Sequence, residues 1–168
     1  MAALINPLIK VFQISDYIMN MVLGDVSNND ALKRVRGTEG SSVTWVVGHL
    51  CFYRVNIMNM FGSDKQNDFE EFYNKNEATE GAGYPEVSDV LKKWNNLSKE
   101  FYDVMKNVTD DQLSKPEKSN GTHNEKTVLD TLTFLNWHEA YHMGVIGMIR
   151  KEFGYSGTAD LAVAASKN

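Results

Sequence analysis

The sequence has little that would suit it to disulfide stabilisation, nucleic-acid binding or membrane insertion. Its single cysteine, Cys51, cannot form an internal disulfide, which favours a reducing compartment, and we expect a cytoplasmic protein. The formal net charge is -5 and the longest basic cluster is KRVR at 33–36, so no basic surface for nucleic acid is expected. The apolar N-terminus is interrupted by Lys10 and Asp16 and follows no basic region, so we expect neither a signal peptide nor a membrane span.

The sequence also lacks the pattern of a β-sheet protein. No segment alternates apolar and polar residues over the length of a strand between hairpin turns, and no repeat of solenoid length is present. Apolar residues recur instead at steps of three and four, which is typical of amphipathic helices. The length of 168 residues and the hydrophobic content of 42% predict one domain with a single core.

Four segments carry this helical periodicity, and each lies between residues that favour helix ends. They run from Asn6-Pro7 to Gly24, from Ser41-Ser42 to Gly62, from Pro85 to Val108, and from Thr127, with Asp130 in a capping-box-like position, to Gly154. Helices of this length bury their apolar faces against one another, so the predicted fold is all-α, a four-helix bundle over residues 1–154. Residues 155–168 are expected to form a C-terminal tail with little to anchor it.

The segments between these helices are polar. Two connections are long, residues 25–40 and 63–83, and the second is expected to contain a short helix at 69–74. The stretch at 115–126 is expected to be a mobile loop, and His123 within it is interpreted as a solvated side chain.

The strongest chemical signal is the pattern H-E-x-x-H, which begins at His138 and ends at His142. On a helix these two histidines lie about 40° apart and one turn along, close enough for both imidazoles to hold one ion. Both fall on the apolar stripe of their helix, and two imidazoles buried together need separate partners unless one cation serves both. His49 lies midway along the second helix, beside Gly48, which allows close helix approach. The three histidines meet the requirement of a catalytic-type site, with three nitrogen ligands and a fourth position open.

The same pattern is a signature of zinc peptidases, which need a further ligand downstream. The extended form of that motif requires glycine at 145 and histidine at 148, where this chain has Val145 and Met148. Glu152 is the only glutamate after His142, and it lies too close along the same helix to fold back onto the ion. Asp160 follows a turn, but its spacing does not match the zinc peptidases with an aspartate ligand. With no predicted strand to bind substrate, the peptidase interpretation is disfavoured.

Other side chains are candidates for the open side of the site. Glu139 lies about 60° round the helix from His142, where it could accept a hydrogen bond from a ligand or act as a base. The simpler interpretation is an exposed helical carboxylate. Cys51 lies about 200° round its helix from His49 and should not reach the ion. Each remaining candidate is individually more typical of core or surface: Trp45, Tyr53, Asn56, Trp137 and Tyr141.

Three stretches resemble parts of one protein family. SSVTWVVGHLCFYRVNIMNMFG at 41–62 resembles the second helix of the DinB-like (YfiT-like) proteins, with a histidine after a tryptophan and a glycine. TVLDTLTFLNWHEAYHMGVIGMIRKEFG at 127–154 resembles their last helix, with its H-x-x-x-H. PEVSDVLKKWNNLSKEFYDVMKNVTDDQL at 85–113 looks like their third helix and the short turn after it. The resemblance covers nearly all of residues 4–154.

The resemblance implies a four-helix bundle, often a homodimer, with a three-histidine site for nickel, zinc or a similar divalent ion. Carried over residue by residue, the ligands are His49, His138 and His142, the same three that helical spacing selects. The family often has H-R-G-Q at the last ligand, but here Met143 and Val145 take the positions of the arginine and the glutamine.

The characterised relatives implied by the resemblance include thiol-dependent S-transferases and isomerases, and other relatives are only described as metal-dependent hydrolases. We therefore predict a metal-dependent enzyme in which three histidines hold one divalent ion, zinc or nickel, that activates water or a low-molecular-weight thiol for reaction with a small-molecule substrate. Three imidazoles also suit copper and iron, so the sequence does not select the metal. One alternative is a bundle that binds metal without turnover, which the missing polar residues at 143 and 145 favour. Another is a metal-free structural bundle.

Overall fold

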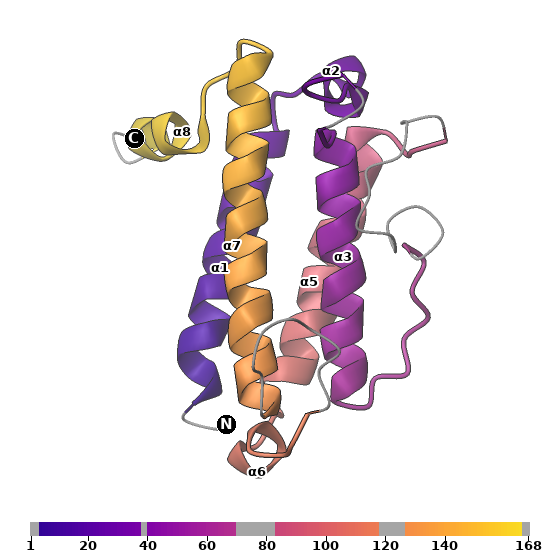
Figure 1. Cartoon of the computed structure of the whole chain (residues 1–168), viewed down its shortest axis with the longest axis vertical. Helices are drawn as coiled ribbons and strands as arrows, with labels where there is room; N and C mark the ends of the chain where they lie inside the picture. Colours follow the sequence, from indigo (N-terminus) through magenta and orange to yellow (C-terminus); the bar gives the residue numbers. More distant parts are fainter. Residues whose placement is uncertain (1–3, 38–39, 70–82, 118–126, 166–168) are drawn as a thin grey trace.

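The computed structural model describes residues 4–37, 40–69, 83–117 and 127–165 (Figure 1). Four long helices dominate it: α1 (Ile5–Leu23), α3 (Val43–Met60), α5 (Val87–Met105) and α7 (Val128–Glu152). Three shorter helices are α2 (Asn28–Leu32), α6 (Asp110–Leu113) and α8 (Thr158–Ala165). Within the described residues there is no strand, and the only β-type pairing is an isolated bridge between Pro116 and Thr127. The predicted all-α four-helix bundle is confirmed.

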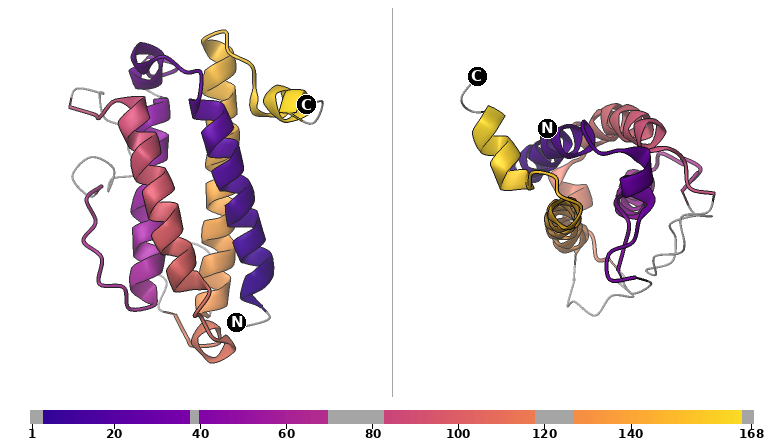
Figure 2. Two further views of the ribbon diagram at one scale, coloured as in Figure 1. Left: turned by 180° about the vertical axis from the view of Figure 1, so that it is seen from behind. Right: turned by 90° about the horizontal axis from the view of Figure 1, so that it is seen from above.

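The four long helices form a closed ring in which α1 packs on α7 and α5, and α3 packs on α5 and α7 (Figure 2). Helices α1 and α7 run in one direction, and α3 and α5 run in the other (Figure 1). The end of α3 and the start of α5 therefore lie at opposite ends of the bundle, which explains why the connection between them is long. Helices α3 and α7, which carry the predicted histidines, are antiparallel neighbours.

The helix ends follow the capping signals of the sequence. The Ser42 side chain accepts a hydrogen bond from the backbone N–H of Trp45 at 3.1 Å, which satisfies one of the free donors at the start of α3. Thr127 and Asp130 form a capping box at the start of α7. Gly154 follows α7 with a φ of +84°, a left-handed conformation that favours glycine.

The C-terminal segment differs from the expected tail, because residues 158–165 form α8, which packs on α1 and α7. The apolar pattern of α8 is weak, and none of its residues is fully buried. The sequence analysis missed the helix for this reason. Gly147 allows the approach, since a Cβ at this position would lie 2.6 Å from the hydroxyl oxygen of Thr158.

Two further expectations fall outside the described part of the chain. The short helix expected at 69–74 lies almost wholly within residues 70–82, and His123 lies within residues 118–126. In the part of the chain that the structure describes, no helix has both the length and the apolar character that a bilayer crossing requires.

Candidate metal centre

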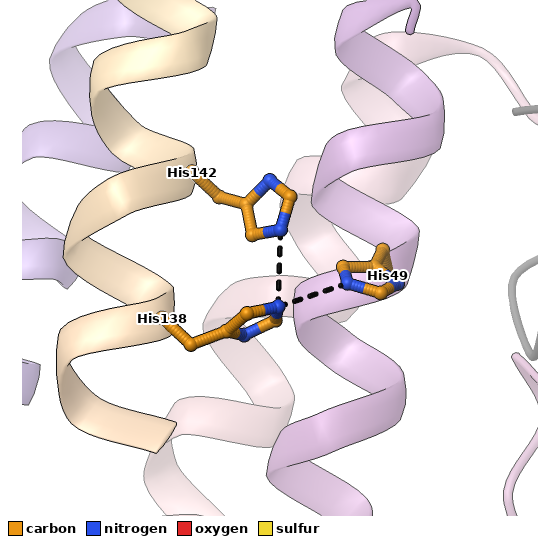
Figure 3. A group of neighbouring side chains, drawn as sticks. All are labelled: His49, His138 and His142. Carbon is orange, nitrogen blue, oxygen red and sulfur yellow. Dashed lines mark hydrogen bonds between the residues drawn. The ribbon is translucent and has the colours of Figure 1, made fainter. Parts of the chain in front are cut away.

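The three predicted histidines come together between two helices (Figure 3). Helix α3 contributes His49, and α7 contributes His138 and His142, one turn apart. The Nε2 atom of His138 lies 3.2 Å from Nε2 of His49 and 3.1 Å from Nε2 of His142. Each histidine thus offers one nitrogen to a group whose ligand atoms all lie within 4.8 Å of one another. The structure places together all three residues that the sequence analysis selected.

This arrangement fits a bound cation better than a set of hydrogen bonds. A tetrahedral zinc ion with Zn–N distances of about 2.0–2.1 Å places its nitrogen ligands about 3.3 Å apart, close to the two distances between Nε2 of His138 and its neighbours. In a neutral imidazole each nitrogen offers either one proton or one lone pair, yet Nε2 of His138 faces two other ring nitrogens. One hydrogen bond can satisfy only one of these contacts. A cation can accept a lone pair from all three rings.

Burial keeps the α7 histidines in the form that binds metal. It lowers the pKa of His138 from its ordinary value, because the charged imidazolium loses hydration. The pKa of His142 is lowered to about 3, chiefly by burial and additionally by the neighbouring His138 and His49. A metal ion competes with protons for the imidazole lone pair, so neutral rings near pH 7 favour binding.

A cavity of about 310 Å³ lies at the three histidines. Its other lining residues are all aromatic: Trp45, Tyr53, Phe134, Trp137 and Tyr141. Four of the five additional candidates from the sequence therefore reach the site. The fifth, Asn56, is outside the lining and accepts a hydrogen bond from the Asn67 side-chain amide at 3.3 Å. Phe134 was missed, although it lies one turn before His138 on the same helix face.

Glu139 is not an exposed carboxylate, so that interpretation is wrong, and it does not line the cavity. Its side chain is buried in the bundle, with 3% of the residue exposed. One carboxylate oxygen accepts a hydrogen bond from Nη2 of Arg54 at 2.7 Å, and the other accepts one from Nε at 2.9 Å. Both carboxylate oxygens are thus occupied by Arg54. A carboxylate held in this way is poorly suited to act as a base at the metal centre.

Arg54 lies at the centre of a buried polar cluster that the sequence analysis did not find. Its Nη1 atom donates to Asp16 at 2.7 Å and to the hydroxyl of Ser98 at 2.6 Å. The Tyr102 hydroxyl donates to the other oxygen of Asp16. The guanidinium also lies 3.9 Å from the ring centroid of Trp94. We call Asp16, Arg54, Ser98, Tyr102 and Glu139 the arginine cluster, which joins all four long helices.

Arg54 keeps its charge although it is buried. Burial alone lowers the pKa of Arg54, but the adjacent carboxylates of Glu139 and Asp16 more than offset this and raise the pKa above its usual value. By contrast, burial raises the pKa of the Cys51 thiol, so that the thiol stays neutral. Cys51 is not part of the histidine group, in agreement with its expected position on the helix.

The fold and the site define a class of protein: an all-α bundle with a candidate metal centre of three histidines between two antiparallel helices. Comparison with known families places the chain in a family of matching fold. The family model of the DinB superfamily matches residues 18–146, a span that contains all three histidines, and the chain belongs to this superfamily. No curated protein matches the chain.

Among solved structures, the chain is similar to YfiT from Bacillus subtilis, with a TM-score of 0.67 and 16% sequence identity over 90% of this chain and 89% of that chain. YfiT is described as "a probable metal-dependent hydrolase with an unusual four-helix bundle topology". At this level of identity the likeness shows the fold.

Proposed function

We propose that this protein is a metal-dependent hydrolase that holds one divalent cation, zinc or nickel, through His49, His138 and His142. The observation that carries the proposal is the convergence of three Nε2 atoms, at 3.1 and 3.2 Å from the central one, in the wall of a cavity. The similarity to YfiT, described as a metal-dependent hydrolase, supports hydrolysis as the reaction class. The substrate is a small molecule, because the cavity measures only about 310 Å³.

A divalent cation held by three imidazoles supplies Lewis-acid chemistry, because it polarises a bound carbonyl or phosphoryl oxygen and makes bound water more acidic. The protein's own residues supply position and shielding. Three neutral histidines leave the full positive charge on the ion, whereas a carboxylate ligand would reduce it. His49 is almost fully buried at 3% exposure, so its side of the site excludes water. A substrate therefore reaches the three histidines through the cavity between the aromatic side chains.

A second candidate reaction is the transfer of a low-molecular-weight thiol, and the composition of the cavity wall favours it. Among the described residues that line the cavity there is no carboxylate to act as a general base. A thiol needs a base less than water does, because a thiol bound to a metal ion is deprotonated directly. The two reactions use the same three histidines and differ in the nucleophile.

The reaction class can be tested with chromogenic esters, amides and phosphate esters, assayed with and without a small thiol. We expect turnover of at least one water-dependent substrate that is lost on chelation, restored by zinc or nickel, and abolished in His138→Ala. A Tyr17→Ala variant, altered on the exposed surface of α1, serves as the control with unchanged turnover. Turnover that appears only with added thiol would replace hydrolysis by thiol transfer. Turnover that survives in His138→Ala would contradict the proposal.

A further inference from the structure

The three histidines are surrounded by aromatic rings on both helices. On α3, Trp45 stacks on His49 with ring centroids 4.7 Å apart, and Tyr53 meets His49 edge-on at 4.8 Å. On α7, the Phe134 ring lies 6.0 Å from His138. The Tyr141 ring lies 5.1 Å from His142. The site therefore opens between two aromatic walls.

These walls carry no formal charge. None of the described residues that line the cavity is a lysine, an arginine, an aspartate or a glutamate. The nearest charged side chains of α3 and α7, Arg54 and Glu139, are paired with each other inside the bundle. A charged substrate group that entered the cavity would lose hydration without gaining an opposite charge from the wall. Away from the three histidines, the aromatic wall therefore favours an uncharged group.

Two of the rings are held in solvent at the edge of the cavity. Trp137 and Tyr141 are 59% and 55% exposed, and their rings stack at 5.8 Å with an interplanar angle of 26°. When a flat group covers an exposed aromatic ring face, apolar surface is removed from water and the free energy of the complex is lowered. Their place beside the histidines distinguishes them from Tyr17, an equally exposed aromatic residue on α1 that does not line the cavity.

From these observations we propose that the cavity binds a flat, uncharged aromatic or heteroaromatic ring of a small substrate against Trp137 and Tyr141. The substrate's reacting group then lies at the three histidines, and for that end of the molecule the inference rests on the proposed function. A volume of about 310 Å³ is at the lower end of the range for ligand pockets, so the ring system has one or two rings.

Calorimetric titration of the full-length protein with three probes tests this inference. The probes are 2-naphthamide, its saturated decahydro analogue, and 2-naphthalenesulfonate, which keeps the rings but adds a negative charge. Each is titrated into protein as purified and into protein treated with a chelator, so that attraction between the sulfonate and the metal is removed. We expect 2-naphthamide to bind at least tenfold more tightly than either other probe to the chelated protein. Equal affinities for all three probes would overturn the inference.

Variants place the bound ring in the cavity. Trp137→Ala and Tyr141→Ala should each weaken 2-naphthamide binding at least fivefold, whereas Tyr17→Ala should leave it unchanged. Because all three side chains are largely exposed, the variants should fold, and their melting temperatures check this. Unchanged binding in Trp137→Ala and Tyr141→Ala would overturn the inference.

Metal content of the same preparations separates this inference from the proposed function. If the protein holds no zinc or nickel and 2-naphthamide still binds in a manner that depends on Trp137, only the proposed function fails. If the protein holds metal and 2-naphthamide does not bind, only the aromatic-ring inference fails.

Discussion

Two polar clusters include residues of both α3 and α7, and they differ in how their members are paired. In the arginine cluster, one guanidinium meets two carboxylates and a hydroxyl, so positive and negative charges offset each other. In the histidine cluster, three rings of the same kind direct nitrogen atoms at one point. The arginine cluster contains its own opposite charges and stabilises the fold without a ligand. The histidine cluster contains only ligands of one kind, and a bound cation would give all three a partner. Residue pairing thus distinguishes the arginine cluster from the candidate metal centre.

The two clusters are nonetheless adjacent along both helices. Arg54 is five residues after His49 on α3, and Glu139 directly follows His138 on α7. The ion pair between Arg54 and Glu139 therefore fixes how α3 and α7 lie against each other next to the site. We infer that the arginine cluster holds the two helices in the register at which their histidines meet.

The largest expected effect is on stability, from Arg54→Met. This change leaves two carboxylates in the bundle without their cation, and removing one partner of a buried ion pair typically destabilises a protein by about 3–5 kcal/mol. Urea unfolding measures the change in the free energy of unfolding. The control is Lys92→Met, which removes an exposed ion pair with Asp89 and should change the free energy of unfolding by less than about 1 kcal/mol. Similar losses in the two variants would remove the distinction between the clusters.

The next effect is stabilisation by the metal itself. A ligand that binds only the folded state at about 100 times its dissociation constant adds about 2.7 kcal/mol to the free energy of unfolding. Chelation should therefore lower the melting temperature of the wild-type protein, and zinc or nickel should restore it. In His138→Ala the melting temperature should not respond to either treatment. A response of equal size in this variant would place the metal elsewhere.

Glu139→Gln sharpens the comparison, because it changes the arginine cluster one residue away from a ligand. Loss of the charged hydrogen bonds to Arg54 should destabilise the fold by about 1–3 kcal/mol. Metal content per folded chain should stay at the wild-type level, because the glutamine side chain can still accept a hydrogen bond from Arg54 and hold the helix register, and Glu139 does not line the cavity. A loss of metal without a loss of stability would show that Glu139 belongs to the metal site instead.

The smallest effect is expected for Asn56→Ala. Asn56 lies outside the cavity wall and is only partly buried, so the free energy of unfolding should change by about 0.5 kcal/mol or less. Metal content and turnover should match the wild type. A large loss of turnover at unchanged stability would mean that Asn56 reaches the reacting atoms.

The parts of the site that the sequence could predict are those that follow from position along one helix. His138 and His142 lie on one face because they are four residues apart, and Trp45 and Tyr53 lie beside His49 for the same reason. Phe134 obeys this rule with respect to His138 and could have been found by it. The rule fails for Glu139, whose partner Arg54 is 85 positions away on another helix. Helical spacing gives the direction of a side chain but not the residue it meets.

The fold shows the same limit. The four long helices could be predicted because each has an apolar stripe and its own end signals. Helix α8 could not, because it is short and its residues stay largely at the surface. Its position depends instead on contacts with α1 and α7, such as the close approach of Thr158 to Gly147. These contacts join parts of the chain that local patterns do not relate.

The most direct test of the metal site is elemental analysis of the protein purified without chelators, beside His49→Ala. His49 is the only member of the histidine group on α3, so its removal leaves two ligands on one helix. We predict about one zinc or nickel ion per chain in the wild type, as expected for a single site of three nitrogen ligands, and almost none in a variant that keeps its helical circular dichroism. Equal metal content in the two proteins, or no metal in the wild type even after incubation with zinc and nickel, would contradict the account.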